Sequence, residues 1–93
     1  MNLEAINNII NSEKITIIDF YAAWCQPCKA ITKQLVALDT QKYNIIKVDI
    51  DKYPEIAEHY NVSAIPHILY FKSSNLIKST VGVVDLSKIL ESI

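Results

Sequence analysis

Two short apolar runs with a helical pattern between them constrain the fold of this chain more than any other feature. Residues 15–22 and 44–49 are rich in β-branched side chains and almost continuously apolar, which is typical of strands buried on both faces. Residues 25–39 lie between them and carry an apolar stripe from Cys28 to Leu38 along one side of a helix. Strands joined by a helix are expected to pair in parallel through a right-handed crossover.

Five further elements complete a predicted order of helix, strand, helix, strand, helix, strand, strand and helix. A short helix begins at Pro54. The last two strands flank Ser73, Ser74 and Asn75 and are expected to form a hairpin, with Asn75 able to take the left-handed conformation. The final helix follows Asp85, a candidate N-cap. We therefore expect an α/β fold whose four-stranded mixed sheet is flanked by helices on both faces. The five ranges are 3–12, 54–60, 67–72, 76–81 and 86–93.

Length and charge exclude several classes of protein. At 93 residues the chain forms one domain, 1–93, and its 51% hydrophobic content is that of a globular protein. The net charge is −1, and the nine basic residues, all lysine, form neither the patch of a nucleic-acid binder nor the basic amphipathic helix of a membrane-surface protein. The first fourteen residues lack the pattern of a secretory signal, so we expect a cytoplasmic protein, although a chain whose signal had been removed would look the same.

The only two cysteines, Cys25 and Cys28, stand three residues apart where the first strand passes into a helix. One helical turn brings the two side chains to the same face, at a separation that suits a disulfide. Free N–H groups and the helix dipole at this position stabilise a thiolate at Cys25, and the thiolate is the reactive form. The pattern favours redox chemistry.

Three other interpretations of the cysteine pair stay open. A structural bridge across so short a loop would add little stability. A zinc site needs two more ligands, and the only histidines, His59 and His67, are separated by seven residues instead of the usual three to five, so we expect no metal. The third interpretation is a protein that no longer performs exchange and only binds a partner.

The segment from Asp19 to Lys29, DFYAAWCQPCK, closely resembles the active-site segment of thioredoxins, in which a buried aspartate precedes Trp-Cys-Gly-Pro-Cys-Lys. The similarity extends over residues 15–93. Three more segments resemble the family at the right distances: 47–51, a central strand that carries a lysine; 60–66, which leads into the cis-proline; and 81–82, with the glycine beside the substrate groove.

The resemblance implies a thioredoxin fold and the reduction of protein disulfides by dithiol exchange through Cys25 and Cys28, without a bound cofactor. It also implies a flavin-dependent thioredoxin reductase as the partner that returns the pair to the dithiol form. Asp19 would be a buried acid that takes and returns the proton of Cys28, with Lys47 paired to it. The residues implied in substrate binding are Trp24, Gln26, Pro27, Ile65, Pro66 and Gly82, with a cis bond before Pro66.

Each supporting residue also has a simpler interpretation. Asp19 could be a strand-end residue that reaches water, and Lys47 an ordinary surface lysine whose stem lies along the protein. Trp24 could belong to the core, and Pro66 to a plain turn. His67 is either a half-exposed strand residue without a role or a proton donor near the thiols.

The sequence departs from the thioredoxin pattern at several positions. Gln26 replaces the usual glycine between the cysteines, His67 follows the proline where threonine is usual, and Lys33 and Ser74 stand where a proline and a glycine are common. The chain starts too late to hold the family's first strand, so we expect four strands instead of five. These departures leave two alternatives to a reductase, namely a binding module on the same fold and a disulfide oxidase or isomerase.

Overall fold

The computed structural model describes residues 1–93 and contains all eight predicted elements in the predicted order. Asp85 is the N-cap of the last helix, as predicted. The helix ends differ most from the prediction, because every helix stops one to three residues earlier and Cys25 is an N-cap just outside its helix. The elements are α1 (Leu3–Ile10), β1 (Ile15–Tyr21), α2 (Gln26–Val36), β2 (Tyr43–Asp49), α3 (Pro54–His59), β3 (His67–Lys72), β4 (Asn75–Val81) and α4 (Leu86–Glu91).

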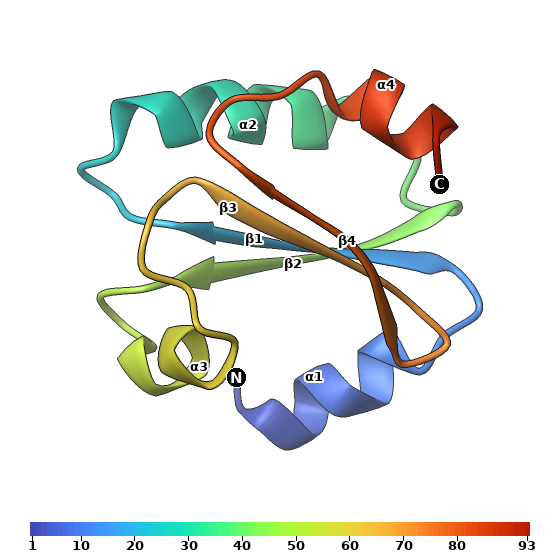
Figure 1. Cartoon of the computed structure of the whole chain (residues 1–93), viewed down its shortest axis with the longest axis horizontal. Coiled ribbons are helices and arrows are strands. Elements are labelled where there is room, and N and C mark those ends of the chain that lie inside the picture. Colours follow the sequence, from blue (N-terminus) through green and yellow to red (C-terminus); the bar gives the residue numbers. More distant parts are fainter.

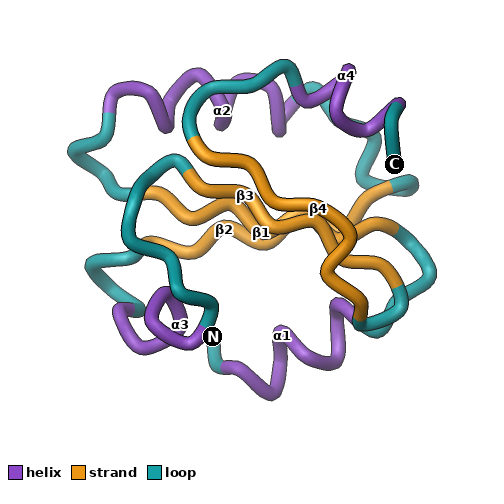
Figure 2. The backbone as a smooth tube through the Cα atoms, viewed as in Figure 1, coloured by secondary structure: helices purple, strands orange, loops and turns teal.

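The four strands form one mixed sheet in the order β2-β1-β3-β4. Helices α2 and α4 lie against one face, and α1 and α3 lie against the other (Figure 1). The tube in Figure 2 shows the strands as a central layer between these two helical layers. The predicted α/β fold with a four-stranded mixed sheet and helices on both faces is therefore confirmed. None of the helices is both long and apolar enough to cross a lipid bilayer.

The direction of β3 corrects one prediction. β1 and β2 pair in parallel as expected, but β3 runs antiparallel to β1 and therefore also to β2, to which α3 links it. Phe20 pairs with Val48 on one side and His67 on the other, so β3 begins at the end of the sheet where β2 ends. The connection through α3 therefore stays at one end of the sheet and does not return along the strands.

Alternation along β1 divides the core between the two faces of the sheet. Ile18 and Phe20 belong to a buried cluster with α1 and α3, whereas Ile17 belongs to a second cluster with α2 and α4. Asp19 is two residues after Ile17 and therefore faces α2. β1 is buried along nearly its whole length, which explains its continuous apolar sequence.

The turn between β3 and β4 closes the end of α1. Ser73 and Ser74 both have positive φ, 50° and 67°, as a two-residue type I′ turn requires, and Asn75 is already in β4. The prediction that Asn75 is the left-handed residue was therefore wrong, because register against β3 moved the turn back along the chain. The backbone N–H of Ser74 donates to the carbonyl of Ile10 at 2.9 Å, and that of Ser73 to the carbonyl of Ser12 at 2.9 Å.

Candidate active site

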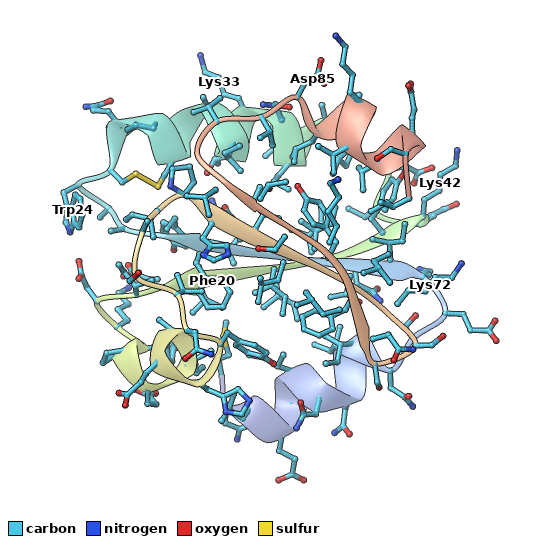
Figure 3. All side chains as sticks on the ribbon, viewed as in Figure 1. Phe20, Trp24, Lys33, Lys42, Lys72 and Asp85 are labelled. Atoms are coloured by element: carbon cyan, nitrogen blue, oxygen red, sulfur yellow. A yellow bond between two sulfur atoms is a disulfide. The ribbon has the colours of Figure 1, made fainter.

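The cysteine pair lies between β1 and α2 and forms a disulfide in this structure (Figure 3). Cys25 is the N-cap of α2, and Pro27 lies in the first turn, where its missing N–H leaves no helical hydrogen bond unmade. The two Cα atoms are 5.3 Å apart, as the spacing of one helical turn predicts. Cys25 is 4% exposed and Cys28 is 2% exposed, so the pair reaches the surface only along a narrow edge.

The start of α2 places a hydrogen-bond donor against the first sulfur atom. The backbone N–H of Cys28 donates to Sγ of Cys25, with 3.2 Å between nitrogen and sulfur. It is one of the first N–H groups of the helix, which have no backbone acceptor. When the disulfide is reduced, this donor and the helix dipole stabilise a negative charge on Sγ of Cys25. Ala22 packs with the pair, and Ile50 and Ile65 lie around it.

Asp19 is a fully buried carboxyl group on the face of β1 that α2 covers. Its relative exposure is 0%, and neither carboxylate oxygen has a hydrogen-bond partner. Burial raises the pKa of Asp19 from 3.8 to about 6, and the positive charge of Lys47 offsets part of that rise. The alternative of a carboxylate that reaches water at the strand end is excluded. A buried group that titrates near neutral pH is suited to proton transfer.

Lys47 follows the register of the sheet, in which it is the direct partner of Asp19 across β1 and β2. Its Nζ lies 3.9 Å from Oδ2 of Asp19 and 4.5 Å from the centre of the Tyr21 ring. The same Nζ donates to Oγ1 of Thr32 at 2.6 Å, and the Thr32 hydroxyl donates to the carbonyl of Cys28 at 3.2 Å. Lys47 is therefore not an ordinary surface lysine, and Thr32, four residues after Cys28 on α2, is a member of the site that the sequence did not reveal.

Trp24 is a surface residue, 68% exposed, and not part of the core. Its indole N–H donates to Oδ2 of Asp51 at 2.9 Å, and the loop that carries Asp51 is itself held by Asp49, whose side chain accepts from the Asp51 backbone N–H. Asp51 was not predicted as a site residue. The predicted parallel pairing of β1 and β2 could have indicated it, because the loops that follow two parallel strands lie at the same edge of the sheet.

The structure brings the other residues implied in substrate binding to this edge in two groups. Gln26 and Pro27 are exposed in the first turn of α2. Ile65 is half-buried beside the cysteines, and neither its N–H nor its carbonyl makes a hydrogen bond within the chain. The bond between Ile65 and Pro66 is cis. Gly82, with φ +87°, donates its N–H to the Pro66 carbonyl at 2.8 Å, which ties the end of β4 to this loop.

The two histidines lie apart from each other. His59 is exposed on α3, where its ring meets the edge of Tyr60. His67 Nε2 lies 2.9 Å from Oγ of Ser79 on β4, and burial lowers the pKa of His67. No group of three or more His, Cys, Asp or Glu side chains is arranged to hold a metal ion.

Comparison with known proteins assigns the chain to a family. The family model described as Thioredoxin matches residues 2–93. The chain belongs to the thioredoxin family. Thioredoxin from Chlamydia trachomatis is 41% identical over 81 residues, a match that covers 85% of this chain and 79% of that protein. Thioredoxin-2 from Pyricularia oryzae is 36% identical over 83 residues, covering 87% of this chain and 48% of that protein.

Solved thioredoxin structures match the fold closely. Mitochondrial thioredoxin 3 from Saccharomyces cerevisiae, in its oxidised form, superposes with a TM-score of 0.86 at 31% identity, covering 99% of this chain and 91% of that one. The chain spans about half the length of several thioredoxins it matches, Thioredoxin-2 among them, and about four-fifths of the Chlamydia thioredoxin. Membership of the family, together with the Cys25–Cys28 pair, supports thiol–disulfide oxidoreductase activity of the protein-disulfide reductase type.

Proposed function

We propose that this chain reduces disulfide bonds of other proteins by dithiol exchange. The observation that carries the proposal is the position of Cys25 Sγ, which caps α2, accepts a hydrogen bond from the Cys28 N–H and is bonded to the second sulfur. A thiolate stabilised in this way is a nucleophile toward a disulfide, and a second thiol one turn away can displace the product. The thioredoxin relatives support the same activity.

The reaction runs in two exchanges. The Cys25 thiolate attacks one sulfur of the substrate disulfide, which forms a mixed disulfide and releases the other substrate sulfur as a thiolate that takes a proton. Cys28 then loses its proton to the Asp19 carboxylate and attacks Sγ of Cys25. The mixed disulfide breaks, the second substrate sulfur leaves and is protonated, and Cys25 and Cys28 become a disulfide. The substrate gains two electrons and two protons. This chain supplies both electrons and the proton of Cys28, which Asp19 passes on, and water supplies the other proton.

The surface around the cysteines is suited to a polypeptide substrate. Trp24, Gln26 and Pro27 are exposed around Cys25, and the free N–H and carbonyl of Ile65 can pair with an extended chain as an added strand does. Pro66 and Gly82 hold that segment in place through the hydrogen bond between them. One solved structure that matches this chain comes from work on how a yeast mitochondrial 1-Cys peroxiredoxin is resolved through the glutathione and thioredoxin systems. For regeneration we propose a flavin-dependent thioredoxin reductase.

A trapping experiment tests the mechanism. A Cys28→Ser variant, incubated with insulin as the disulfide substrate, should accumulate a mixed disulfide through Cys25, visible as an adduct on a non-reducing gel and by mass spectrometry. The matched Cys25→Ser variant should form none, because Cys28 lies inside the helix and not at its N-cap, so its thiolate is not stabilised in the same way. Absence of the adduct from the first variant, or equal adduct from both, would contradict the mechanism.

The direction of exchange is settled by the equilibrium of the pair with glutathione. We expect a reductant, with a potential near the value of about −270 mV that typifies reducing thioredoxins. A potential above about −200 mV would instead assign the chain to the oxidases or isomerases. A variant with both cysteines replaced by serine distinguishes a reductase from a binding module. A protein that only binds would keep its biological activity in this variant, whereas a reductase would lose it.

A further inference from the structure

Thr32 lies between the lysine of the site and its second cysteine. Its hydroxyl oxygen is 2.6 Å from Nζ of Lys47, and the hydroxyl donates to the carbonyl of Cys28 at 3.2 Å. Nζ of Lys47 is 3.9 Å from Oδ2 of Asp19, which is beyond hydrogen-bond distance. The nearest partner of the ammonium is therefore a neutral hydroxyl, although a buried carboxylate with no hydrogen bond lies next to it.

The contacts of Thr32 explain why the ammonium stops short of the carboxylate. The hydroxyl uses its hydrogen for the Cys28 carbonyl, so its lone pairs are left to accept from Lys47. The ring of Tyr21, 4.5 Å from Nζ, supports the ammonium from another side. Because a lysine stem is flexible, the ammonium would move onto Asp19 if the hydroxyl did not hold it.

We propose that Thr32 is a positioning residue that holds the Lys47 ammonium off Asp19 and so leaves the carboxylate able to take the proton of Cys28. This inference depends on the proposed function, in which Asp19 is the proton acceptor. A full ion pair with Lys47 would make the carboxylate a weaker base. The hydroxyl keeps the positive charge close enough to influence Asp19 but not bonded to it.

Asp19 has few other groups that could produce the same effect. Lys47 is the one cation whose charge acts on its pKa. The hydroxyl of Tyr70 is engaged by Thr80 at 3.0 Å, and α4 contributes only apolar side chains to this cluster. The strands place these titratable groups on the α2 face of the sheet: Tyr21 from β1, Tyr43, Lys47 and Asp49 from β2, Tyr70 and Lys72 from β3, and Lys78 from β4. In the reduced protein α2 adds Cys28.

The test removes the hydroxyl and then restores it. In Thr32→Val, Lys47 should close onto Asp19 and lower the pKa of that carboxyl by about one pH unit, measured by NMR titration of the oxidised protein, in which the cysteines do not titrate. In the reduced protein, the measured quantity is the rate at which the mixed disulfide with insulin is resolved, as a function of pH. The pH at which this rate rises should move down by the same amount, and the maximal rate should fall several-fold. Thr32→Ser should restore both values, and Thr40→Val, an exposed threonine in the loop after α2, should change neither.

The outcomes separate this inference from the proposed function. The NMR titration does not depend on activity, so failure of the Cys28→Ser trap would overturn the reaction while the titration still tests the contact. An unchanged Asp19 titration in Thr32→Val would overturn the positioning role. A serine variant that behaves like the valine variant would also overturn it, because the methyl group and not the hydroxyl would then be responsible. A shifted titration with an unchanged rate profile would refute the link to Cys28.

Discussion

Replacement of Asp19 by asparagine should make the protein more stable at neutral pH, and the gain should depend on pH. Asp19 is fully buried, and its oxygens have no hydrogen-bond partner. Burial raises its pKa from 3.8 to about 6, so ionisation of this group opposes folding. Asparagine has nearly the same shape and carries no charge at any pH. Lys47 is partly exposed and keeps its bond to Thr32, so it is not left buried without a partner.

The size of the effect follows from the pKa. A rise from 3.8 to about 6 corresponds to about 3 kcal/mol, since each pKa unit is worth about 1.4 kcal/mol. At about pH 3 and below, well under the ordinary pKa of 3.8, the carboxyl is protonated in the folded and unfolded chains, and its burial costs nothing. As the pH rises through 3.8 toward about 6, the unfolded chain ionises and the folded chain does not, so the parent protein loses stability, and from about pH 7 upward the full cost is present. The asparagine variant does not have this loss.

Guanidinium unfolding of the oxidised protein at a series of pH values from 3.5 to 8 would measure the effect. The free energies of unfolding of parent and Asp19→Asn should differ least at the acid end of the series and should separate by up to about 3 kcal/mol at pH 7 and above. Glu58→Gln, which removes an exposed carboxylate with no ion pair, should keep the pH dependence of the parent. Parallel curves for parent and Asp19→Asn would refute the argument that ionisation of Asp19 is disfavoured by burial.

Two further substitutions test contacts that hold loops in place. The side chain of Gln34 donates to the Val84 carbonyl at 2.7 Å and accepts from the Leu86 N–H at 2.8 Å. Gln34→Leu should therefore lower the free energy of unfolding, measured in guanidinium, by about 1–3 kcal/mol. An unchanged free energy would mean that these two hydrogen bonds add nothing to stability. Ser73 has φ 50° and no side-chain hydrogen bond, so its backbone is strained and glycine would relieve that strain. Ser73→Gly should therefore raise the melting temperature by a few degrees, equivalent to up to about 1 kcal/mol. A lower melting temperature would contradict the assigned strain.

The order of the elements could be predicted because hydrophobic periodicity records which faces are buried. The run from Ile15 to Tyr21 is apolar on both faces because β1 has a helical layer on each side. The direction of β3 could not be predicted in this way, since a buried strand has the same pattern in either direction, and the connection of residues 50–66 is long enough for either. The turn was misplaced because Asn75 and Ser74 both tolerate positive φ, and only the pairing with β3 chooses between them.

The candidate site was predictable where chemistry and position coincide in the sequence. The spacing of the cysteines and the acid inside an apolar strand are local signals, and the structure places both on the α2 side of the sheet. Ile65 and Gly82 came from resemblance to thioredoxins, because nothing local marks them. Thr32 and Asp51 were not predicted, because nothing in the local sequence marks them. Thr32 belongs to the site only because β2 brings Lys47 next to it, and Asp51 only because the loop after β2 lies beside Trp24.

The bond between the hairpin and the first helix has a consequence for how the chain folds as it is made. Ser74 supplies the partner of the last carbonyl of α1, that of Ile10, and Ser73 supplies the partner of the Ser12 carbonyl just after the helix. The side chain of Ser74 also donates to Asn11, 63 residues earlier in the sequence. An eight-residue helix is too short to persist alone in water. About four-fifths of the chain must therefore be synthesised before the last turn of α1 is closed, and this end of the helix becomes stable only when that long-range contact can form.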